Sequence, residues 1–255
     1  MKRIWLTGAS SGIGQALATR LLEEGHLLAI SARRLEPLQA LAERFPGQVL
    51  VASGDLSEAA DVRLIAEQIT SHWGALDCAI LNAGTCEYID AQHFEAAMVE
   101  RVVRANLFSA SHCIEAALPL LRRAESPHLV GVASAVTYLP LPRSGAYGAS
   151  KAGLRYLLES LRIDLAQQGI DVTVISPGFV DTPLTQRNDF AMPMRWPVDK
   201  AAAYIAARLR ARPLEIAFPG PFIAALSLLA ALPARLQLAI GKRLARREQN
   251  DKDAS

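Results

Sequence analysis

Cysteine is scarce in this sequence of 255 residues. The three cysteines, Cys78, Cys86 and Cys113, are an odd number without a Cys-x-x-Cys pair, which argues against a disulfide framework. The five histidines show no spacing typical of zinc ligands, so the sequence predicts no metal site. A protein of the reducing cytoplasm fits this composition best.

An excess of charge of either sign is also missing. Lys and Arg number 27 and Asp and Glu 25, and no basic face stands out before residue 230, which argues against a dedicated nucleic-acid-binding protein. Hydrophobic residues make up 51% of the chain, and this content excludes a disordered or fibrous protein.

Long apolar runs are missing as well. Only residues 4–6 are apolar after the basic start of the chain, so no export signal is expected. The uncharged stretch 216–234 is interrupted by prolines, which leaves an apolar helix of about eleven residues, too short to cross a bilayer.

The chain does contain short apolar runs that alternate with amphipathic stretches. The runs have few polar residues, as in strands that helices cover on both faces. Strands are expected at residues 3–7, 27–31, 49–52, 77–82, 129–134 and 172–176. Helices are expected to begin near Gly12, Leu35, Ser57, Ala91, Asn106 and Gly145. After residue 181 we expect only a loop followed by helices.

This order predicts an α/β protein with a doubly wound parallel sheet of the Rossmann type, in a single domain with a C-terminal helical extension. We expect the nucleotide-binding catalytic domain at residues 1–220, with a substrate loop at about 182–197, and the apolar and basic extension at 221–255. The ligand crevice should lie at the carboxyl ends of the strands.

A glycine-rich loop, Thr7-Gly8-Ala9-Ser10-Ser11-Gly12-Ile13-Gly14, connects the first strand to the first helix. Glycines allow close backbone approach, and the free N–H groups at a helix N-terminus attract a pyrophosphate. A plain strand-to-helix turn is the alternative, but the position between strand and helix favours dinucleotide binding. The residues expected to bind it are Gly8, Ser10, Ser11, Gly12, Ile13 and Gly14.

Two arginines, Arg33 and Arg34, follow the second strand, where an acidic residue would bind the ribose 2′-hydroxyl of NAD. Guanidinium groups suit a 2′-phosphate instead, so the sequence predicts NADP(H) as the cofactor. The alternative is that both arginines only begin the next helix in solvent.

Tyr147 and Lys151 are four residues apart at the start of a predicted helix and therefore share one face. A nearby ammonium favours the tyrosinate form and would bring the phenol toward use as a proton donor and acceptor. Ser134 ends its own strand thirteen residues earlier, at the same sheet edge as the glycine loop. A simple pairing on the helix surface is the alternative.

With these features at one crevice, the sequence resembles the short-chain dehydrogenase/reductase family. The resemblance covers residues 1–182 and rests on the T-G-x-x-x-G-x-G and Y-x-x-x-K motifs. It departs from the common family pattern at Ser11, where members that prefer NADP often have a basic residue. The prediction of NADP(H) therefore depends mainly on Arg33.

The resemblance implies further site residues. Asn106 matches the fourth catalytic position beside Ser134, Tyr147 and Lys151, where a helix irregularity lets a backbone carbonyl hold a water molecule. Tyr147 and Lys151 are implied to contact the cofactor too. The other implied cofactor-binding residues are Asp55, Leu56, Asn82, Ala83, Gly84, Pro177, Gly178, Val180 and Thr182.

The resemblance also implies hydride transfer between NADP(H) and a carbonyl or alcohol substrate, with Tyr147 as general acid/base and Lys151 lowering its pKa. The mostly apolar segments on either side of the site predict an apolar small molecule as substrate, although Arg143, Arg187 and Arg195 could bind an acidic group. The residues expected to contact the substrate are Val136, Tyr138, Leu139, Leu141, Phe190, Met192, Met194 and Trp196. The alternative is that the aromatic residues and methionines of these segments only pack under a lid.

The C-terminal segment 222–247 combines an apolar helix with basic residues, a composition typical of interfacial helices. Peripheral membrane contact, a cover over the pocket and packing against a partner subunit all remain open. The family resemblance implies a homodimer or homotetramer. Two other functions stay open: a non-catalytic NADP-binding sensor or scaffold, and a lipid-binding protein of the membrane surface.

Overall fold

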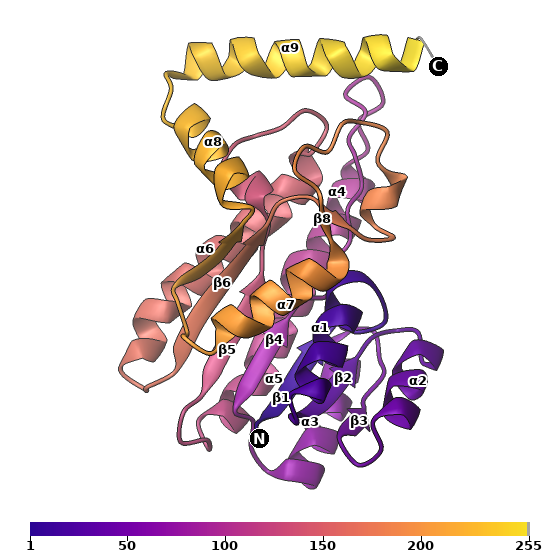
Figure 1. Cartoon of the computed structure of the whole chain (residues 1–255), viewed down its shortest axis with the longest axis vertical. Helices are drawn as coiled ribbons and strands as arrows, with labels where there is room; N and C mark the ends of the chain where they lie inside the picture. Colours follow the sequence, from indigo (N-terminus) through magenta and orange to yellow (C-terminus); the bar gives the residue numbers. More distant parts are fainter. Residues whose placement is uncertain (254–255) are drawn as a thin grey trace.

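The computed structural model describes residues 1–253, and for Arg187 and 246–253 it describes the backbone alone. Residues 254 and 255 of the expected extension lie outside this part of the chain. Within it, a parallel sheet is covered by helices on both faces, and two further helices follow its last strand (Figure 1).

The sheet has seven strands in the order β3-β2-β1-β4-β5-β6-β9, and all of the pairs are parallel. Its strands are β1 (Arg3–Thr7), β2 (Leu27–Ser31), β3 (Val49–Val51), β4 (Cys78–Leu81), β5 (His128–Val132), β6 (Asp171–Pro177) and β9 (Glu215–Phe218). A separate small sheet pairs β7 (Val180–Asp181) with β8 (Trp196–Pro197).

The α-helices are α1 (Gly12–Glu23), α2 (Glu36–Arg44), α3 (Ala59–Trp73), α4 (Ala96–Val103), α5 (Ser109–Leu121), α6 (Gly145–Ala166), α7 (Val198–Leu209), α8 (Gly220–Ala230) and α9 (Ala234–Asp253). The short elements are the π-helix η1 (Arg104–Phe108) and the 3₁₀ helices η2 (Ala135–Thr137) and η3 (Thr185–Arg187).

Each strand buries alternate residues on opposite faces, because side chains alternate along an extended backbone. In β1, Ile4 and Leu6 pack into the core under α1, α2 and α7, whereas Trp5 packs into the core under α3, α5 and α6. Helices therefore exclude water from both faces of the sheet, which explains the nearly continuous apolar runs in the sequence. The predicted doubly wound parallel sheet is confirmed.

All six expected strands are present, but the seventh strand of the main sheet, β9, and the short strands β7 and β8 were not expected. Residues after 181 were expected to form only a loop and helices, yet β9 pairs with β6 along its length. A four-residue strand that begins with the charged Glu215 lacks the apolar run of the others. Its place in the sheet depends on pairing with β6, which the local sequence does not encode.

A helix was expected to begin near Asn106, and α5 begins at Ser109, but it continues an earlier helix and is not a new one. α4, η1 and α5 are consecutive, so Asn106 lies inside a π-helical turn in the middle of a helical segment. The expected start near Ala91 was also early, because α4 begins at Ala96. No helix in the described part of the chain is both long and apolar enough to cross a membrane.

Candidate active site

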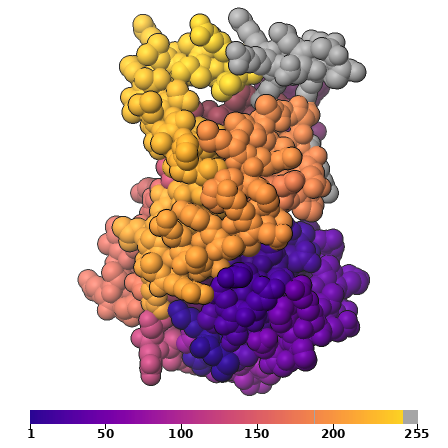
Figure 2. Space-filling model, in the orientation of Figure 1, coloured from indigo at the N-terminus to yellow at the C-terminus, as the bar shows by residue number. Residues whose placement is uncertain are grey.

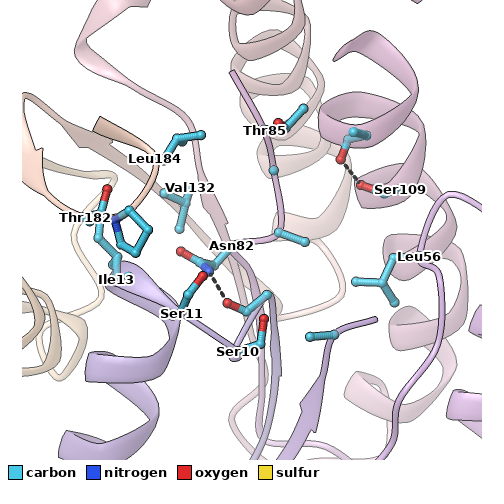
Figure 3. A pocket seen from close by; sticks show the side chains of 18 of the residues that line it. Ser10, Ser11, Ile13, Leu56, Asn82, Thr85, Ser109, Val132, Thr182 and Leu184 are labelled. Atoms are coloured by element: carbon cyan, nitrogen blue, oxygen red, sulfur yellow. Dashed lines mark hydrogen bonds between the residues drawn. The ribbon is translucent and has the colours of Figure 1, made fainter. Parts of the chain in front are cut away.

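A cavity of about 760 Å³ runs along the carboxyl ends of the main-sheet strands, and Figure 3 shows part of its lining. Every catalytic and cofactor-binding residue expected from the sequence lines it except Asn106. These residues are Gly8, Ser10, Ser11, Gly12, Ile13, Gly14, Arg33, Arg34, Asp55, Leu56, Asn82, Ala83, Gly84, Ser134, Tyr147, Lys151, Pro177, Gly178, Val180 and Thr182.

The glycine loop turns sharply between β1 and α1. Gly8 and Gly12 have φ angles of +68° and +56°, which glycine adopts without the clash of a Cβ atom. A Cβ atom at Gly14 would collide with the Gly8 carbonyl oxygen. Ser11, the N-cap of α1, makes no side-chain hydrogen bond to the first turn, so that turn presents backbone N–H groups at the cavity wall.

Asn82 holds this loop in place from the neighbouring strand β4. Its Nδ2 atom donates to the carbonyl oxygens of Thr7 and Gly8 at 3.1 and 3.2 Å, and its backbone N–H donates to Thr7 Oγ1 at 2.9 Å. The loop position therefore depends on an amide that reaches from β4 to the end of β1.

Basic groups lie at the far end of the cavity, after β2. Arg34 donates to the Ser10 carbonyl at 3.2 Å and so connects this end to the glycine loop. Burial would raise the pKa of Asp55, but hydrogen bonds from Ser57 and the charge of Arg33 hold it below its usual range. Arg33 therefore lines the cavity opposite a carboxylate.

At the other end, Ser134 follows β5 and caps η2, where its Oγ accepts from the Val136 N–H at 3.2 Å. Tyr147 and Lys151 come from the first turns of α6. The Lys151 ammonium donates to the Val132 carbonyl at 2.8 Å and is almost fully buried. The end of β5 and the start of α6 thus bring Ser134, Tyr147 and Lys151 together at the cavity.

Burial dominates the titration of the tyrosine and the lysine. It raises the pKa of Tyr147 to about 12, opposed by a hydrogen bond with the Ser134 side chain. It lowers the pKa of Lys151 to about 8. The expected lowering of the Tyr147 pKa by the lysine is not what this structure gives, since desolvation is the larger effect and the ammonium is bonded to Val132.

Asn106 lies behind the cavity wall rather than on it and is fully buried. Its Oδ1 accepts from the Thr85 N–H at 2.7 Å, and its Nδ2 donates to the Thr85 carbonyl and to Ser150 Oγ at 2.9 and 2.8 Å. The side chain therefore joins the segment after β4 to α6, next to Lys151. The π-helical turn η1 is the local irregularity at this position.

Some cavity residues were not expected from the sequence. Arg101 and Arg104, one turn apart, reach the cavity from α4 and η1. Cys86 does not line the cavity, but it interacts electrostatically with Tyr147 and Lys151, and burial raises the pKa of its thiol. Its position two residues after Asn82-Ala83-Gly84 is the one sequence feature that could have indicated it.

None of the eight expected substrate residues is among the residues that line the cavity. Trp196 stacks on Phe218 with ring centroids 5.0 Å apart and packs against the core, so it is structural. Phe190 instead meets the rings of Tyr88 and Phe179 at 5.4 and 6.1 Å. The loop between β7 and β8 therefore joins the segment after β4 through aromatic contacts.

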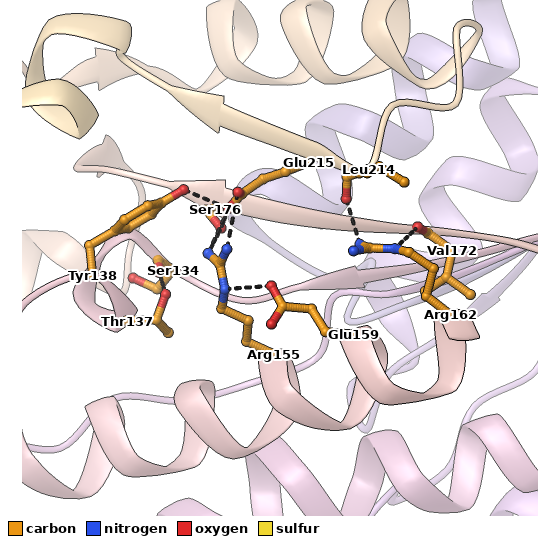
Figure 4. Close-up of polar contacts among 10 residues, drawn as sticks. All are labelled: Ser134, Thr137, Tyr138, Arg155, Glu159, Arg162, Val172, Ser176, Leu214 and Glu215. Atoms are coloured by element: carbon orange, nitrogen blue, oxygen red, sulfur yellow. Dashed lines mark hydrogen bonds and ion pairs between the residues drawn. The ribbon is translucent and has the colours of Figure 1, made fainter. Parts of the chain in front are cut away.

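A polar network supports the segment that carries Ser134 (Figure 4). Arg155 of α6 binds both carboxylate oxygens of Glu215 in β9, at 2.6 and 3.1 Å. Tyr138 and Ser176 each donate a hydroxyl hydrogen bond to the same carboxylate at 2.6 Å. Burial would raise the pKa of Glu215, but Arg155 and these hydroxyls hold it below its usual range.

Comparison with known proteins places this geometry in context. The short chain dehydrogenase family model matches residues 2–191. An uncharacterized oxidoreductase of Myxococcus xanthus is 32% identical over 94% of this chain and 96% of its own. The 11-beta-hydroxysteroid dehydrogenase 1A of Arabidopsis thaliana is 34% identical over 74% of this chain and 55% of its own. The Pseudomonas aeruginosa RhlG/NADP active-site complex is 30% identical, with a TM-score of 0.79 over 87% of this chain and 96% of that one.

Proposed function

The chain belongs to the short chain dehydrogenase family, and from that premise we propose that it is an NADP(H)-dependent oxidoreductase. It reduces the carbonyl of an apolar small molecule, or oxidises the corresponding secondary alcohol. The observation that carries the proposal is one continuous cavity, with Ser134, Tyr147 and Lys151 at one end and Arg33 and Arg34 at the other.

The residues of this cavity fit a dinucleotide. The uncapped first turn of α1 offers backbone donors for the pyrophosphate. Arg33 and Arg34 supply charge for a 2′-phosphate at the end of β2, where no acidic residue follows the strand. The relative described as an RhlG/NADP complex binds the phosphorylated form, which supports the same choice here.

When bound, the nicotinamide supplies or accepts the hydride. Tyr147 gives the substrate oxygen its proton in the direction of reduction, because a pKa of about 12 keeps the phenol protonated at neutral pH. Ser134 donates a hydrogen bond to that oxygen and orients it. An ammonium has three donors, so Lys151 keeps donors for a ribose beside its bond to Val132. Asn106 positions the lysine by fixing the adjacent Ser150.

Apolar clusters next to the segments that carry Ser134 and Tyr147 support a class of substrate. Leu139 is buried in a cluster with Leu226 and Ala135, and Ala135 is the residue directly after Ser134. Tyr88 interacts electrostatically with Tyr147, and its ring contacts Phe190, which in turn contacts Phe179. The relative named as an 11-beta-hydroxysteroid dehydrogenase supports a bulky apolar carbonyl compound, such as a steroid-like or aromatic ketone.

Titration of the purified chain with NADPH and with NADH, followed by fluorescence, tests the cofactor. We expect NADPH to bind more tightly, and Arg33→Ala to weaken NADPH binding about tenfold or more with little effect on NADH. Arg63→Ala, an exposed arginine on α3, is the control and should change neither affinity. Equal binding of both cofactors by wild type would contradict the NADP(H) assignment.

Loss of nicotinamide absorbance with a panel of apolar ketones, aldehydes and quinones tests the reaction. Turnover of any member supports the oxidoreductase. Tight NADPH binding without turnover across the panel favours instead the sensor or scaffold function. The intact Ser134, Tyr147 and Lys151 set argues against that alternative, because a sensor needs only the nucleotide end of the cavity.

We further propose a homo-oligomer that forms through α5 and α6. Tyr156 and Ile163 of α6 leave 77% and 75% of their surface exposed, and Phe108, the last residue of η1 directly before α5, leaves 46% exposed. Burial of these side chains against a second copy would stabilise a dimer. Light scattering should give a dimer or tetramer, and Ile163→Asp should reduce it to monomer.

A further inference from the structure

The two C-terminal helices bury almost nothing. Leu226 is the buried residue of α8, and no residue from Ala234 to Ala245 in α9 is buried. In Figure 1 α9 crosses the end of the molecule above α8, and Figure 2 shows the yellow segment standing out from the body. A helix with so little packing needs a further surface to stabilise it.

The attachment of these helices gives α9 a defined position. Leu226 and Phe222 pack with Ala135 and Leu139, which fixes α8 beside the segment after Ser134. Gln237 Nε2 donates to the carbonyl oxygens of Ala230 and Leu232 at 3.0 and 2.7 Å. These bonds close the turn between α8 and α9, so α9 is held against the end of α8.

Leucines on both helices point into solvent. Leu228, Leu236 and Leu238 leave 70%, 51% and 60% of their surface exposed. Leu236, Ile240 and Leu244 are spaced by four residues, so they form one ridge along α9. An apolar ridge next to polar residues is typical of a helix that lies in an interface.

The charged side chains that the structure describes on these helices are all basic, whereas the three acidic residues of α9, Glu248, Asp251 and Asp253, lie at its far end. Residues 220–247 contain five basic residues and no acidic one, although the whole chain carries a formal charge of only +2. Arg235, Lys242 and Arg243 are exposed, whereas the side chains of the other two, Arg246 and Arg247, lie outside the described part. If two copies of the chain paired through these helices by two-fold symmetry, the basic side chains of one copy would face and repel those of the other. Charge complementarity therefore favours an anionic partner.

We propose that α8 and α9 dock the protein on the surface of an anionic phospholipid bilayer. The leucine ridge enters the boundary between headgroups and acyl chains, and the basic residues contact lipid phosphates. The helices lie on the bilayer and do not enter the catalytic mechanism. This docking is independent of the reaction proposed above.

Co-sedimentation of the full chain with vesicles tests the proposal. Vesicles of phosphatidylcholine mixed with phosphatidylglycerol should retain the protein, whereas pure phosphatidylcholine vesicles should not. The double variant Lys242→Gln/Arg243→Gln should weaken partitioning about 25-fold, because each basic residue contributes about fivefold at the surface. Leu236→Ser/Leu244→Ser should weaken it at least tenfold.

Leu64→Ser is the matched control, since Leu64 of α3 is 57% exposed and lies outside the C-terminal helices. It should sediment as wild type does. All variants should keep their turnover in the absence of vesicles, because none of these side chains lines the catalytic cavity.

Two kinds of result would overturn the proposal. One concerns vesicle binding: either equal retention by neutral and anionic vesicles or no retention by either. The other is a fall in oligomeric mass for Leu236→Ser/Leu244→Ser in light scattering with vesicle binding unchanged, which would assign the ridge to a second copy of the chain. The charge variant keeps the test decisive if the leucine variant does not fold, because it leaves the apolar contacts intact.

Discussion

At the amino ends of the strands charged side chains bind one another, whereas at the carboxyl ends they line the cavity. Arg3, at the start of β1, makes three hydrogen bonds to the Asp77 carboxylate before β4, at 2.7 to 3.0 Å. Arg212 binds Asp171 at the start of β6 at 2.6 Å. The polar groups at this end are paired within the protein.

The carboxyl ends hold comparable groups in a different state. Lys151 is buried with a lowered pKa, the first turn of α1 lacks a side-chain cap, and Arg33 lines the open cavity. Hydrogen-bonding capacity is thus held in place there for a ligand. The difference predicts that substitutions at the amino ends lower the free energy of unfolding. Substitutions at the carboxyl ends should instead lower the rate of turnover and leave the free energy of unfolding nearly unchanged.

The largest expected effect belongs to Tyr147→Phe, which removes the proton donor and keeps the ring. Turnover of the carbonyl substrate should fall about a thousandfold, with NADPH affinity and the unfolding temperature unchanged. Tyr156→Phe, an exposed tyrosine on the same helix, is the control and should be fully active. Full activity of Tyr147→Phe with normal NADPH binding would remove the tyrosine from the mechanism.

Asp77→Asn is the counterpart at the amino ends. It should lower the free energy of unfolding by about 2 kcal/mol, because it weakens three hydrogen bonds of a partly buried ion pair. Urea unfolding measures this, and the turnover of the folded protein should stay unchanged. Glu23→Gln, in the exposed pair with Arg44, should cost less than about 0.5 kcal/mol.

The sign of the pH dependence follows from the same pair. The Arg3 guanidinium holds the pKa of Asp77 below its usual range. The stabilisation is therefore present above the ordinary aspartate pKa and is lost as pH falls through the lowered value. A drop in turnover of Asp77→Asn without a drop in stability would break the distinction between the two ends.

The carboxyl-end site could be predicted from sequence far better than the supports around it. Gly8, Gly12, Tyr147 and Lys151 stand in local motifs whose spacing has a physical reason, and the cavity brings them together. The apolar runs likewise predicted six strands, because burial on both faces leaves a local pattern.

The features that the sequence did not predict depend on partners far away in the chain. Glu215 belongs to a strand only through pairing with β6 and Arg155, and Trp196 is structural only because Phe218 stacks on it. The pKa of Tyr147 could not be predicted from its spacing to Lys151 either, since burial is a property of the whole fold.

His128, at the start of β5, should make the stability of the fold depend on pH, and this tests the amino ends further. Burial lowers its pKa to about 4, and its Nε2 lies 2.8 Å from Thr173 Oγ1. The unfolded chain binds more protons than the folded one between that value and the ordinary histidine pKa, so stability rises with pH across this window. At pH 5 the neutral histidine should cost about 2 kcal/mol of stability.

His128→Gln should flatten this slope in urea titrations between pH 4 and 7, whatever its effect at neutral pH. His72→Gln, at an exposed position in α3, should keep the wild-type slope. An unchanged slope in His128→Gln would mean that the histidine is protonated in the folded protein.

The smallest effect is expected for Tyr138→Phe. This residue shares features with the groups paired within the protein at the amino ends and with the groups near the cavity at the carboxyl ends. Its hydroxyl donates a hydrogen bond to Glu215, so it is paired within the protein like the charged groups at the amino ends. Its backbone, however, follows the turn η2, which begins at Ser134. Removal of one hydrogen bond should cost about 1 kcal/mol of stability. Because the turn then loses a support, kcat/KM should fall about fivefold with NADPH affinity unchanged. Tyr204→Phe, packed against Trp196 away from the cavity, is the control. An unchanged kcat/KM with reduced stability would make the Arg155–Glu215 network a purely structural pairing, of the kind found at the amino ends.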